Sequence, residues 1–210
     1  MRLTSEGAAL PRPGPGGRLD AVLGAGCTFH IRGTCSFRDL GSGRMVFLKQ
    51  VHGARIVSDP GGGEEADGMI IRRGAGMPAL KLADCASLFV ASRDFLGAVH
   101  AGWRGLASGA VEALVRAFPG EPELAVAGPC ICASCYRVGP EVRSRVIERS
   151  GGDHPEGRLD LFAALVSQAR DAGLACEVQS SGPCTMCRPD MFHSYRRDAT
   201  LLRNIAWLEG

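Results

Sequence analysis

The segment most informative about the fold is residues 87–120, SLFVASRDFLGAVHAGWRGLASGAVEALVRAFPG. Its apolar runs at 87–91 and 95–100 are typical of buried strands. The segment that follows, 106–118, is predicted to be a helix, which Pro119 and Gly120 end. The apolar residues that share one face of that helix are Leu106, Ala110, Ala113, Leu114 and Ala117.

The same criteria, applied to the rest of the chain, predict more strands than helices. Further strands are expected at 45–48, 54–57, 68–71, 79–82, 123–127, 175–179 and 205–208, and helices at 141–149 and 159–172. Strands and helices do not alternate regularly, so we predict an α+β fold and not a doubly wound sheet. We expect one structural domain, a layered sandwich with mixed sheets. Its main part is 44–210, preceded by a shortened, divergent arm with strands at 1–43, in which the Pro- and Gly-rich segment 7–18 is a loop.

Composition limits the classes of protein that fit. The chain has 210 residues, of which 45% are hydrophobic and 22% charged, so it can bury a core. Its net charge of +2 is too balanced for a protein that mainly coats nucleic acid or an acidic membrane. No run approaches the roughly 18 apolar residues of a membrane helix, and Glu6 stands where a signal peptide would be apolar. We therefore expect a cytoplasmic protein with no nucleic-acid or membrane partner, and the oligomeric state is left open.

Nine cysteines and only five histidines limit how a metal site could be built. An odd number of cysteines without a signal peptide argues against a disulfide framework, and for thiols that bind metal or react.

Three residues at strand ends form a first candidate site. His52 follows one strand, Cys85 stands between two, and His100 ends a third. Two imidazoles and a thiolate suit zinc and would leave a coordination position open, where zinc can activate water near neutral pH. The alternative is a small buried cysteine with two surface histidines, because no short-range ligand spacing links the three.

The loop after His100 is a candidate anion site. Gly102 and Gly105 would let backbone amides approach an anion at the start of a helix, and Arg104 could grip phosphate. The alternative is a glycine-rich helix entry with a surface arginine. A similar choice applies to Arg196, Arg197 and Asp198, which form either an anion clamp or a solvated cluster.

The remaining cysteines allow two further metal sites. His154-x-Glu156 with Pro183-Cys184-x-x-Cys187 matches a zinc-deaminase pattern, although glycines surround His154. Alternatively, Cys132-x-x-Cys135 and Cys184-x-x-Cys187 could make a four-cysteine zinc site, or all of these could be ordinary reduced thiols.

Several motifs occur in an order that resembles the YfiH/YlmD family, also called the laccase-domain or purine nucleoside phosphorylase family. The resemblance covers about residues 44–208. The motifs are Gln50-Val51-His52-Gly53, Ala66-Asp67-Gly68, Ala83-Asp84-Cys85, VHAGWRG at 99–105, Gly128-Pro129, YRVG at 136–139 and SYRRD at 194–198. Before residue 44 the chain departs from the family pattern, and only residues 29–33, with Arg32, echo it.

The resemblance implies an enzyme and assigns roles. It implies zinc-dependent phosphorolysis of adenosine, inosine and guanosine to base and ribose 1-phosphate, with adenosine deamination as a second activity. The implied zinc ligands are His52, Cys85 and His100. Asp84 is expected to donate or orient a proton, and the residues expected to bind substrate and phosphate are Gln50, Gly102, Arg104, Gly105 and Arg32.

Two other functions stay open. One is copper-dependent phenol oxidation, with copper in place of zinc, although five histidines without a His-x-His pair do not furnish a multicopper cluster of the usual kind. The other is a non-nucleoside role in editing the cell-wall peptidoglycan.

Overall fold

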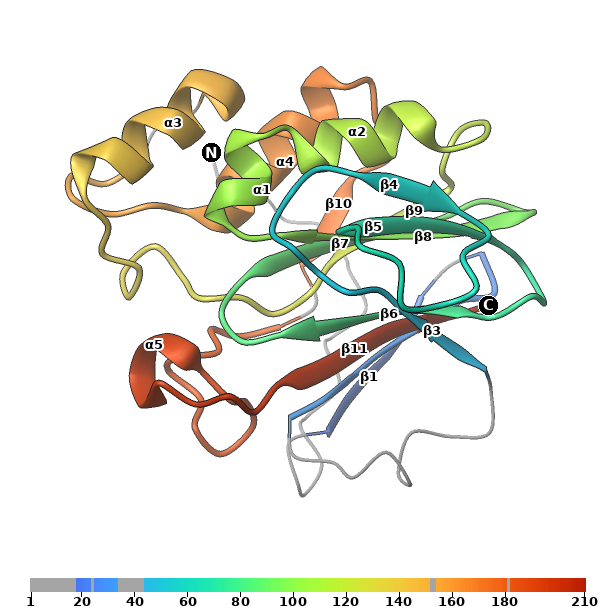
Figure 1. Ribbon diagram of the computed structural model, residues 1–210, viewed down its shortest axis with the longest axis horizontal. Coiled ribbons are helices and arrows are strands. Elements are labelled where there is room, and N and C mark those ends of the chain that lie inside the picture. The colour runs from blue at the N-terminus through green and yellow to red at the C-terminus, as the bar shows by residue number, and fades with distance from the viewer. Residues whose placement is uncertain (1–17, 24, 34–43, 152–153, 181) are drawn as a thin grey trace.

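The computed structural model describes residues 18–23, 25–33, 44–151, 154–180 and 182–210. In this part of the chain, two mixed sheets and a set of helices stack as three layers (Figure 1). The predicted α+β fold in one layered domain is confirmed. The expected loop at 7–18 falls, except for its last residue, outside the described residues, and the boundary at residue 43 stays a prediction.

A five-stranded sheet forms one outer layer, in the order β1-β2-β11-β6-β3. Its strands are β1 (Arg18–Val22), β2 (Thr28–Arg32), β3 (Met45–Phe47), β6 (Met77–Leu82) and β11 (Asn204–Glu209). Sequence patterns placed the last three within a few residues of their observed ends but did not delimit β1 and β2.

A six-stranded sheet forms the middle layer, in the order β10-β9-β7-β8-β5-β4. Its strands are β4 (Ile56–Ser58), β5 (Gly68–Arg72), β7 (Ala86–Ala91), β8 (Phe95–Ala101), β9 (Leu124–Ala127) and β10 (Val178–Ser180). The pairs β4–β5 and β9–β10 are parallel, and the other neighbours are antiparallel. Each of these six strands overlaps a predicted one.

Strand β7 shows why the strands of the middle sheet have nearly continuous apolar sequences. Side chains alternate between the two faces of a strand. Leu88 and Val90 pack into the core under the helices, whereas Phe89 and Ala91 pack into the core between the two sheets. There Phe89 meets Phe29 of β2 edge to face, with ring centroids 5.2 Å apart. A strand buried on both faces is apolar at nearly every position, and the exception in β7 is the buried Ser87.

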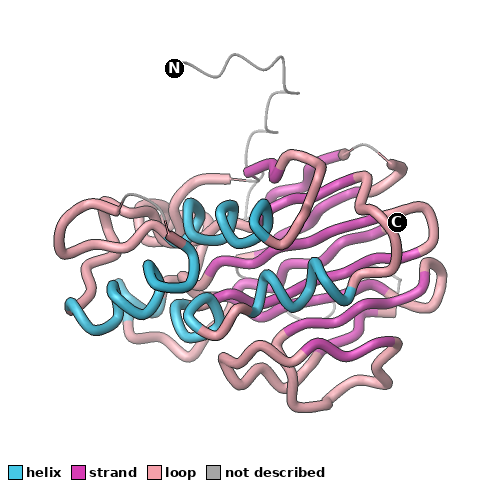
Figure 2. The backbone as a smooth tube through the Cα atoms, turned by 90° about the horizontal axis from the view of Figure 1, so that it is seen from above, coloured by secondary structure: helices cyan, strands magenta, loops and turns pink. Residues whose placement is uncertain are grey.

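The helices are α1 (Trp103–Ala107), α2 (Ala110–Ala117), α3 (Pro140–Ser150), α4 (Leu161–Asp171) and α5 (Tyr195–Asp198). Helices α1 to α4 lie on one side of the six-stranded sheet (Figure 2), and α5 lies at the end of β11 (Figure 1). In the described part of the chain, no helix has the length and apolarity needed to cross a membrane.

The prediction of a single helix at 106–118 is wrong, because this segment contains parts of two helices, α1 and α2. Gly109 has a φ of 76°, which interrupts the helix between α1 and α2. The break rotates the buried face, so that Val111 and Phe118 are buried while Ala117 is exposed. The helices predicted at 141–149 and 159–172 are confirmed as α3 and α4.

Candidate metal centre and adjoining pocket

The structure brings His52, Cys85 and His100 together from three separate segments. Their candidate ligand atoms all lie within 4.8 Å of one another. His52 follows β3, His100 lies near the end of β8, and Cys85 lies in the short link where the chain passes from β6 in one sheet to β7 in the other. The residue before it, Asp84, has a φ of 83°, which allows this abrupt change of direction.

A buried carboxylate, Asp67, organises the cluster. The Nδ1–H of His100 donates to its Oδ1 over 2.9 Å. The backbone N–H groups of His52 and Gly53 also donate to it, over 2.9 and 2.6 Å. One side chain with no solvent exposure therefore holds both the ring of one histidine and the loop that carries the other.

Sequence reasoning gave Asp67 no role of its own. The sequence feature that could have identified Asp67 is its position directly before the apolar strand β5. A carboxylate buried at the start of such a strand must accept hydrogen bonds from nearby donors.

The cluster favours an ionised thiol. Burial raises the pKa of Cys85, but hydrogen bonds from His100 and His52 outweigh it and lower the pKa to about 6. Burial lowers the pKa of His100, but Asp67 and Cys85 raise it to about 9. Burial raises the pKa of Asp67 as well, yet the hydrogen bond from His100 brings it below its ordinary value. A thiolate is the form of cysteine that binds metal.

The donor set fits zinc. Two imidazoles and one thiolate match catalytic zinc sites, which use three protein ligands and keep one position open. Asp67 holds the Nδ1 of His100 and leaves Nε2 as the ligand atom, an arrangement typical of metal-binding histidines. His52 is exposed, so the cluster is open to solvent on its side.

The donor set does not fit a cluster of several copper ions. All five histidines are among the described residues, and only His52 and His100 belong to a group that could hold a metal. His30 contacts Asp20 and Glu209 over 2.6 and 3.1 Å. A mononuclear copper site remains compatible with two histidines and a cysteine.

The glycines of the loop after His100 allow close packing. A Cβ on Gly102 would lie 2.9 Å from the Cys85 sulfur, and one on Gly105 would lie 3.2 Å from the carbonyl oxygen of Gly53. Arg104 is exposed, and its guanidinium lies 4.5 Å from the ring centroid of Trp103. Anion binding by this loop stays a prediction.

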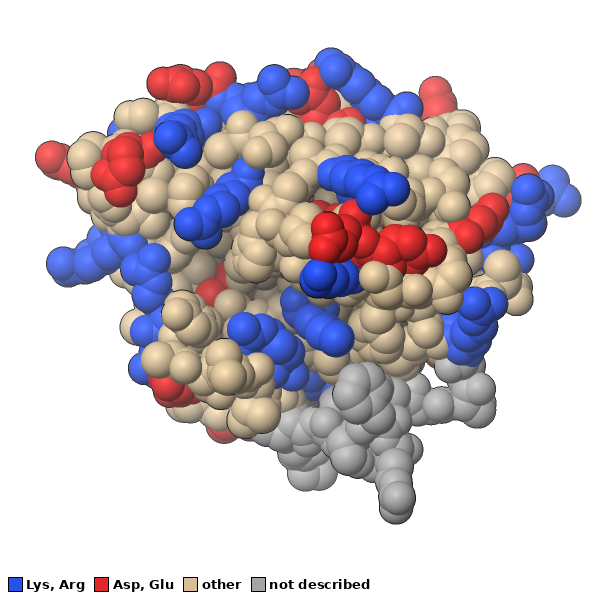
Figure 3. Space-filling view, viewed as in Figure 1, with Lys and Arg blue, Asp and Glu red and all other residues tan. Residues whose placement is uncertain are grey.

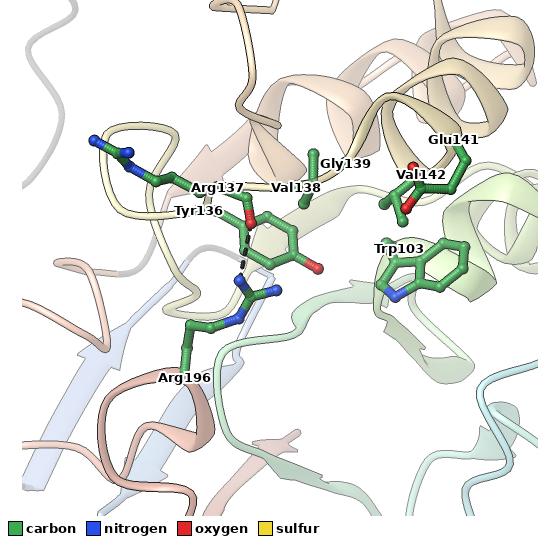
Figure 4. Close-up of a pocket in the computed structure, with 8 residues that line it drawn as sticks. All are labelled: Trp103, Tyr136, Arg137, Val138, Gly139, Glu141, Val142 and Arg196. Atoms are coloured by element: carbon green, nitrogen blue, oxygen red, sulfur yellow. Dashed lines mark hydrogen bonds between the residues drawn. The ribbon is translucent and has the colours of Figure 1, made fainter.

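A pocket of about 360 Å³ adjoins the cluster. It is lined by Trp103, Tyr136, Arg137, Val138, Gly139, Glu141, Val142 and Arg196 (Figure 4). Trp103 directly follows Gly102. The hydroxyl of Tyr136 points toward the Trp103 ring (Figure 4). Burial first, and then the charge of Cys85, raise the pKa of Tyr136 to about 12.

Arg196 supplies a cation to the pocket, which is also lined by Arg137 and by the acidic Glu141. Its guanidinium lies 4.9 Å from the ring centroid of Tyr136 and donates to the carbonyl oxygen of Arg137 over 2.8 Å. Figure 3 shows the surface hollowed on the side of α5, with Lys and Arg side chains at the rim. The neighbouring Arg197 donates to the carbonyl oxygens of Thr185 and Phe192, so it supports the loop.

Two predicted site residues hold backbone segments in place. Both carboxylate oxygens of Asp84 accept hydrogen bonds, from the Thr185 hydroxyl and from the Arg196 N–H, each over 2.7 Å. The side-chain amide of Gln50 donates to the carbonyl oxygen of Lys81 over 3.0 Å and accepts from its N–H over 2.9 Å. Roles in proton transfer or substrate binding stay predictions for both.

Arg32 contacts residues of the five-stranded sheet. The core between the two sheets lies on one face of the five-stranded sheet, and Arg32 lies on the other face. Its guanidinium carbon is 5.1 Å from the ring centroid of Trp207. Its guanidinium donates to Asp20 over 2.6 Å. A role of Arg32 in substrate binding stays a prediction.

The deaminase-like pattern does not assemble. His154 is buried, where its Nδ1 accepts from the Asp160 N–H over 3.2 Å, and it is not part of either group that could hold a metal. Cys184 and Cys187 instead lie with Cys132 and Cys135, and the candidate ligand atoms of these four are all within 4.8 Å of one another.

This fold, with two histidines and a cysteine beside a pocket, is that of a known class of proteins. The family model described as multi-copper polyphenol oxidoreductase laccase matches residues 32–208. The chain belongs to this family, which includes the YfiH and YlmD proteins, as its motifs predict.

Several curated relatives are named purine nucleoside phosphorylase. A purine nucleoside phosphorylase of Xylella fastidiosa is 31% identical over an alignment of 189 positions, which covers 77% of this chain and 71% of that protein. Purine nucleoside phosphorylase YfiH of Shigella flexneri is 31% identical over 181 residues, covering 79% and 74%.

Solved structures share the fold. YlmD from Geobacillus stearothermophilus matches with a TM-score of 0.77 and 23% identity, covering 92% of this chain and 96% of that one. The YfiH protein of Bacillus licheniformis matches with a TM-score of 0.69 and 26% identity, covering 79% and 73%.

Proposed function

We propose that the protein is a zinc-dependent purine nucleoside phosphorylase with adenosine deamination as a second activity. The observation that carries the proposal is the cluster of His52, Cys85 and His100, oriented by Asp67, next to a pocket with aromatic and cationic walls. The names of the relatives support the substrate class. Zinc fits the three donors, and bound there it would act as a Lewis acid and activate water.

The pocket residues suit a nucleoside and phosphate. The volume of the pocket, about 360 Å³, is within the range of small-molecule sites. The rings of Trp103 and Tyr136 offer faces on which a purine can stack. Arg196 at the pocket and Arg104 beside Trp103 offer guanidinium groups, which bind phosphate through paired charge-assisted hydrogen bonds.

Phosphorolysis exchanges one bond for another. A phosphate oxygen bonds to the sugar carbon that holds the purine, the carbon–nitrogen bond breaks, and the base leaves with that electron pair and takes up a proton. The chain would bring both reactants into one pocket and balance the phosphate charge with arginine. In deamination, water replaces the amino group of adenosine, which yields inosine and ammonia.

Asp67 and Asp84 would act as positioning residues. Asp67 holds the His100 ring and the His52 loop, and Asp84 holds the backbone of Arg196 at the pocket. Because Asp84 already accepts two hydrogen bonds, its geometry favours positioning over proton transfer.

The test is chromatography of the products from adenosine and the zinc-loaded protein, with and without phosphate. We expect adenine and ribose 1-phosphate only when phosphate is present, and inosine in both cases. The His100→Ala variant is the control. The proposal is wrong if the wild type forms neither product faster than the His100→Ala variant does. If the copper-loaded protein oxidises a phenol and forms neither product, the alternative function is favoured.

A further inference from the structure

The four cysteines Cys132, Cys135, Cys184 and Cys187 form a second cluster that the proposed reaction does not use. Their sulfur atoms all lie within 4.8 Å of one another, although the two pairs are far apart in sequence. Three of them are half-buried and Cys187 is exposed, so a metal ion could reach them from solvent.

Each pair lies in a turn that brings its two sulfurs to the same side. In the first, which lies between β9 and α3, the N–H of Cys135 donates to the carbonyl oxygen of Cys132 over 3.0 Å. The second lies between β10 and α5. The two turns meet where the backbone N–H of Cys132 donates to the sulfur of Cys184 over 3.3 Å. Such N–H donors stabilise thiolate ligands around a metal.

The spacing suits a tetrahedron of sulfur atoms around one ion. With zinc–sulfur bonds of about 2.3 Å, tetrahedral geometry puts sulfur atoms roughly 3.8 Å apart. The sulfurs of Cys135 and Cys187 are 3.4 Å apart, and none of the four is beyond 4.8 Å from another. A disulfide needs about 2.05 Å and would link only two of the four.

We propose that Cys132, Cys135, Cys184 and Cys187 bind a metal ion in a tetrathiolate site, separate from the centre at His52, Cys85 and His100. Four thiolates in tetrahedral array suit zinc or iron. Zinc is expected, because a site with four protein ligands and no open position is typical of structural zinc.

The ion would hold a loop that supports the first centre. Thr185, within the second turn, donates its hydroxyl to Asp84, which directly precedes Cys85. Arg197 of α5 donates to the carbonyl oxygens of Thr185 and Met186 in the same turn. By fixing this turn to the one before α3, the tetrathiolate site would keep Asp84 in place.

Metal content per chain, measured on protein purified under reducing conditions, tests the proposal without any assay of activity. We expect about two zinc ions in the wild type and about one in a Cys135→Ser, Cys187→Ser double variant. The Cys85→Ser variant should also hold about one zinc ion, because it loses the ion of the first centre and keeps the ion of the tetrathiolate site. Cys176→Ser is the matched control, since Cys176 is a half-buried thiol outside both clusters, and it should keep both ions.

Cobalt substitution gives a second readout that needs no variant to fold. Sulfur-to-cobalt charge transfer grows with the number of thiolates, so the tetrathiolate site should absorb about four times as strongly as a site with one cysteine. In a Cys187→His variant the site should stay filled with weaker absorption, because histidine also binds zinc and cobalt. Iron in place of zinc would support the site and identify its ion.

Two results would overturn the proposal. One is an equal metal content in the wild type and the Cys135→Ser, Cys187→Ser variant. The other is a Cys135–Cys187 disulfide that persists in protein purified under reducing conditions. Failure of the first centre is distinguishable, because it would remove the effect of Cys85→Ser and leave the effect of the double variant.

Discussion

The Nδ1–H of His100 donates to Oδ1 of Asp67 over 2.9 Å, and both side chains are almost fully buried. The same carboxylate accepts the backbone N–H groups of His52 and Gly53. Asp67 therefore links two of the three candidate ligands, and its effect on metal binding can be measured apart from catalysis.

Asp67→Asn should weaken zinc binding at the first centre by about tenfold to a hundredfold, because the carboxylate partner of a metal-binding histidine orients the ring and strengthens it as a ligand. Competition with a chelator measures this. Glu65→Gln is the matched control, since Glu65 is exposed, pairs with Lys49 and should leave zinc affinity unchanged. Equal affinities in all three proteins would contradict the role of Asp67.

Arg104→Ala should raise the KM for phosphate by about tenfold to a hundredfold, because a charge-assisted contact with an anion contributes roughly 1.5–3 kcal/mol. The KM for the nucleoside should change less. Steady-state kinetics with each substrate varied in turn measure both constants. Arg116→Ala, which removes an exposed arginine of α2, should change neither. An unchanged phosphate KM in folded Arg104→Ala would remove this arginine from the anion site.

Thr185→Val should lower the free energy of unfolding by about 1–3 kcal/mol, because it leaves a buried carboxylate oxygen of Asp84 without its donor. Urea unfolding measures the change. Ser134→Ala, in an exposed position, is the control and should be close to neutral. A Thr185→Val protein as stable as the control would mean that this hydrogen bond contributes nothing measurable.

His193 should make stability depend on pH. Burial, together with the positive charges of Arg197 and Arg203, lowers its pKa below the ordinary value of 6.5, against the opposing effect of Asp198. The folded protein then binds fewer protons at this residue than the unfolded chain, so stability rises with pH up to about 6.5 and falls as pH drops below that value.

A His193→Gln variant should therefore lose less stability than the wild type between about pH 7 and pH 5. Unfolding free energies from urea titrations at both pH values give the comparison, in which the other titrating groups cancel. The same loss in both proteins would show that His193 does not contribute.

The parts of the fold that depend on local patterns can be predicted from the amino-acid sequence. The apolar runs of β7 and β8 identify strands buried on both faces, because most positions of such a strand need an apolar side chain. The spacing of apolar residues likewise delimits α3 and α4 within about two residues. Ordered motifs also identified the family, and with it the three residues that the structure brings together.

Contacts between residues far apart in the chain follow from the three-dimensional packing. Asp67 and Asp84 became buried partners of His100 and Thr185 through the packing of strands and loops, which no local period encodes. The same packing separated His154 from Cys184 and left that cysteine beside Cys132. A sequence pattern specifies residue types and spacing along the chain, whereas a binding site requires convergence in space, and that is set by how the two sheets and the helical layer stack.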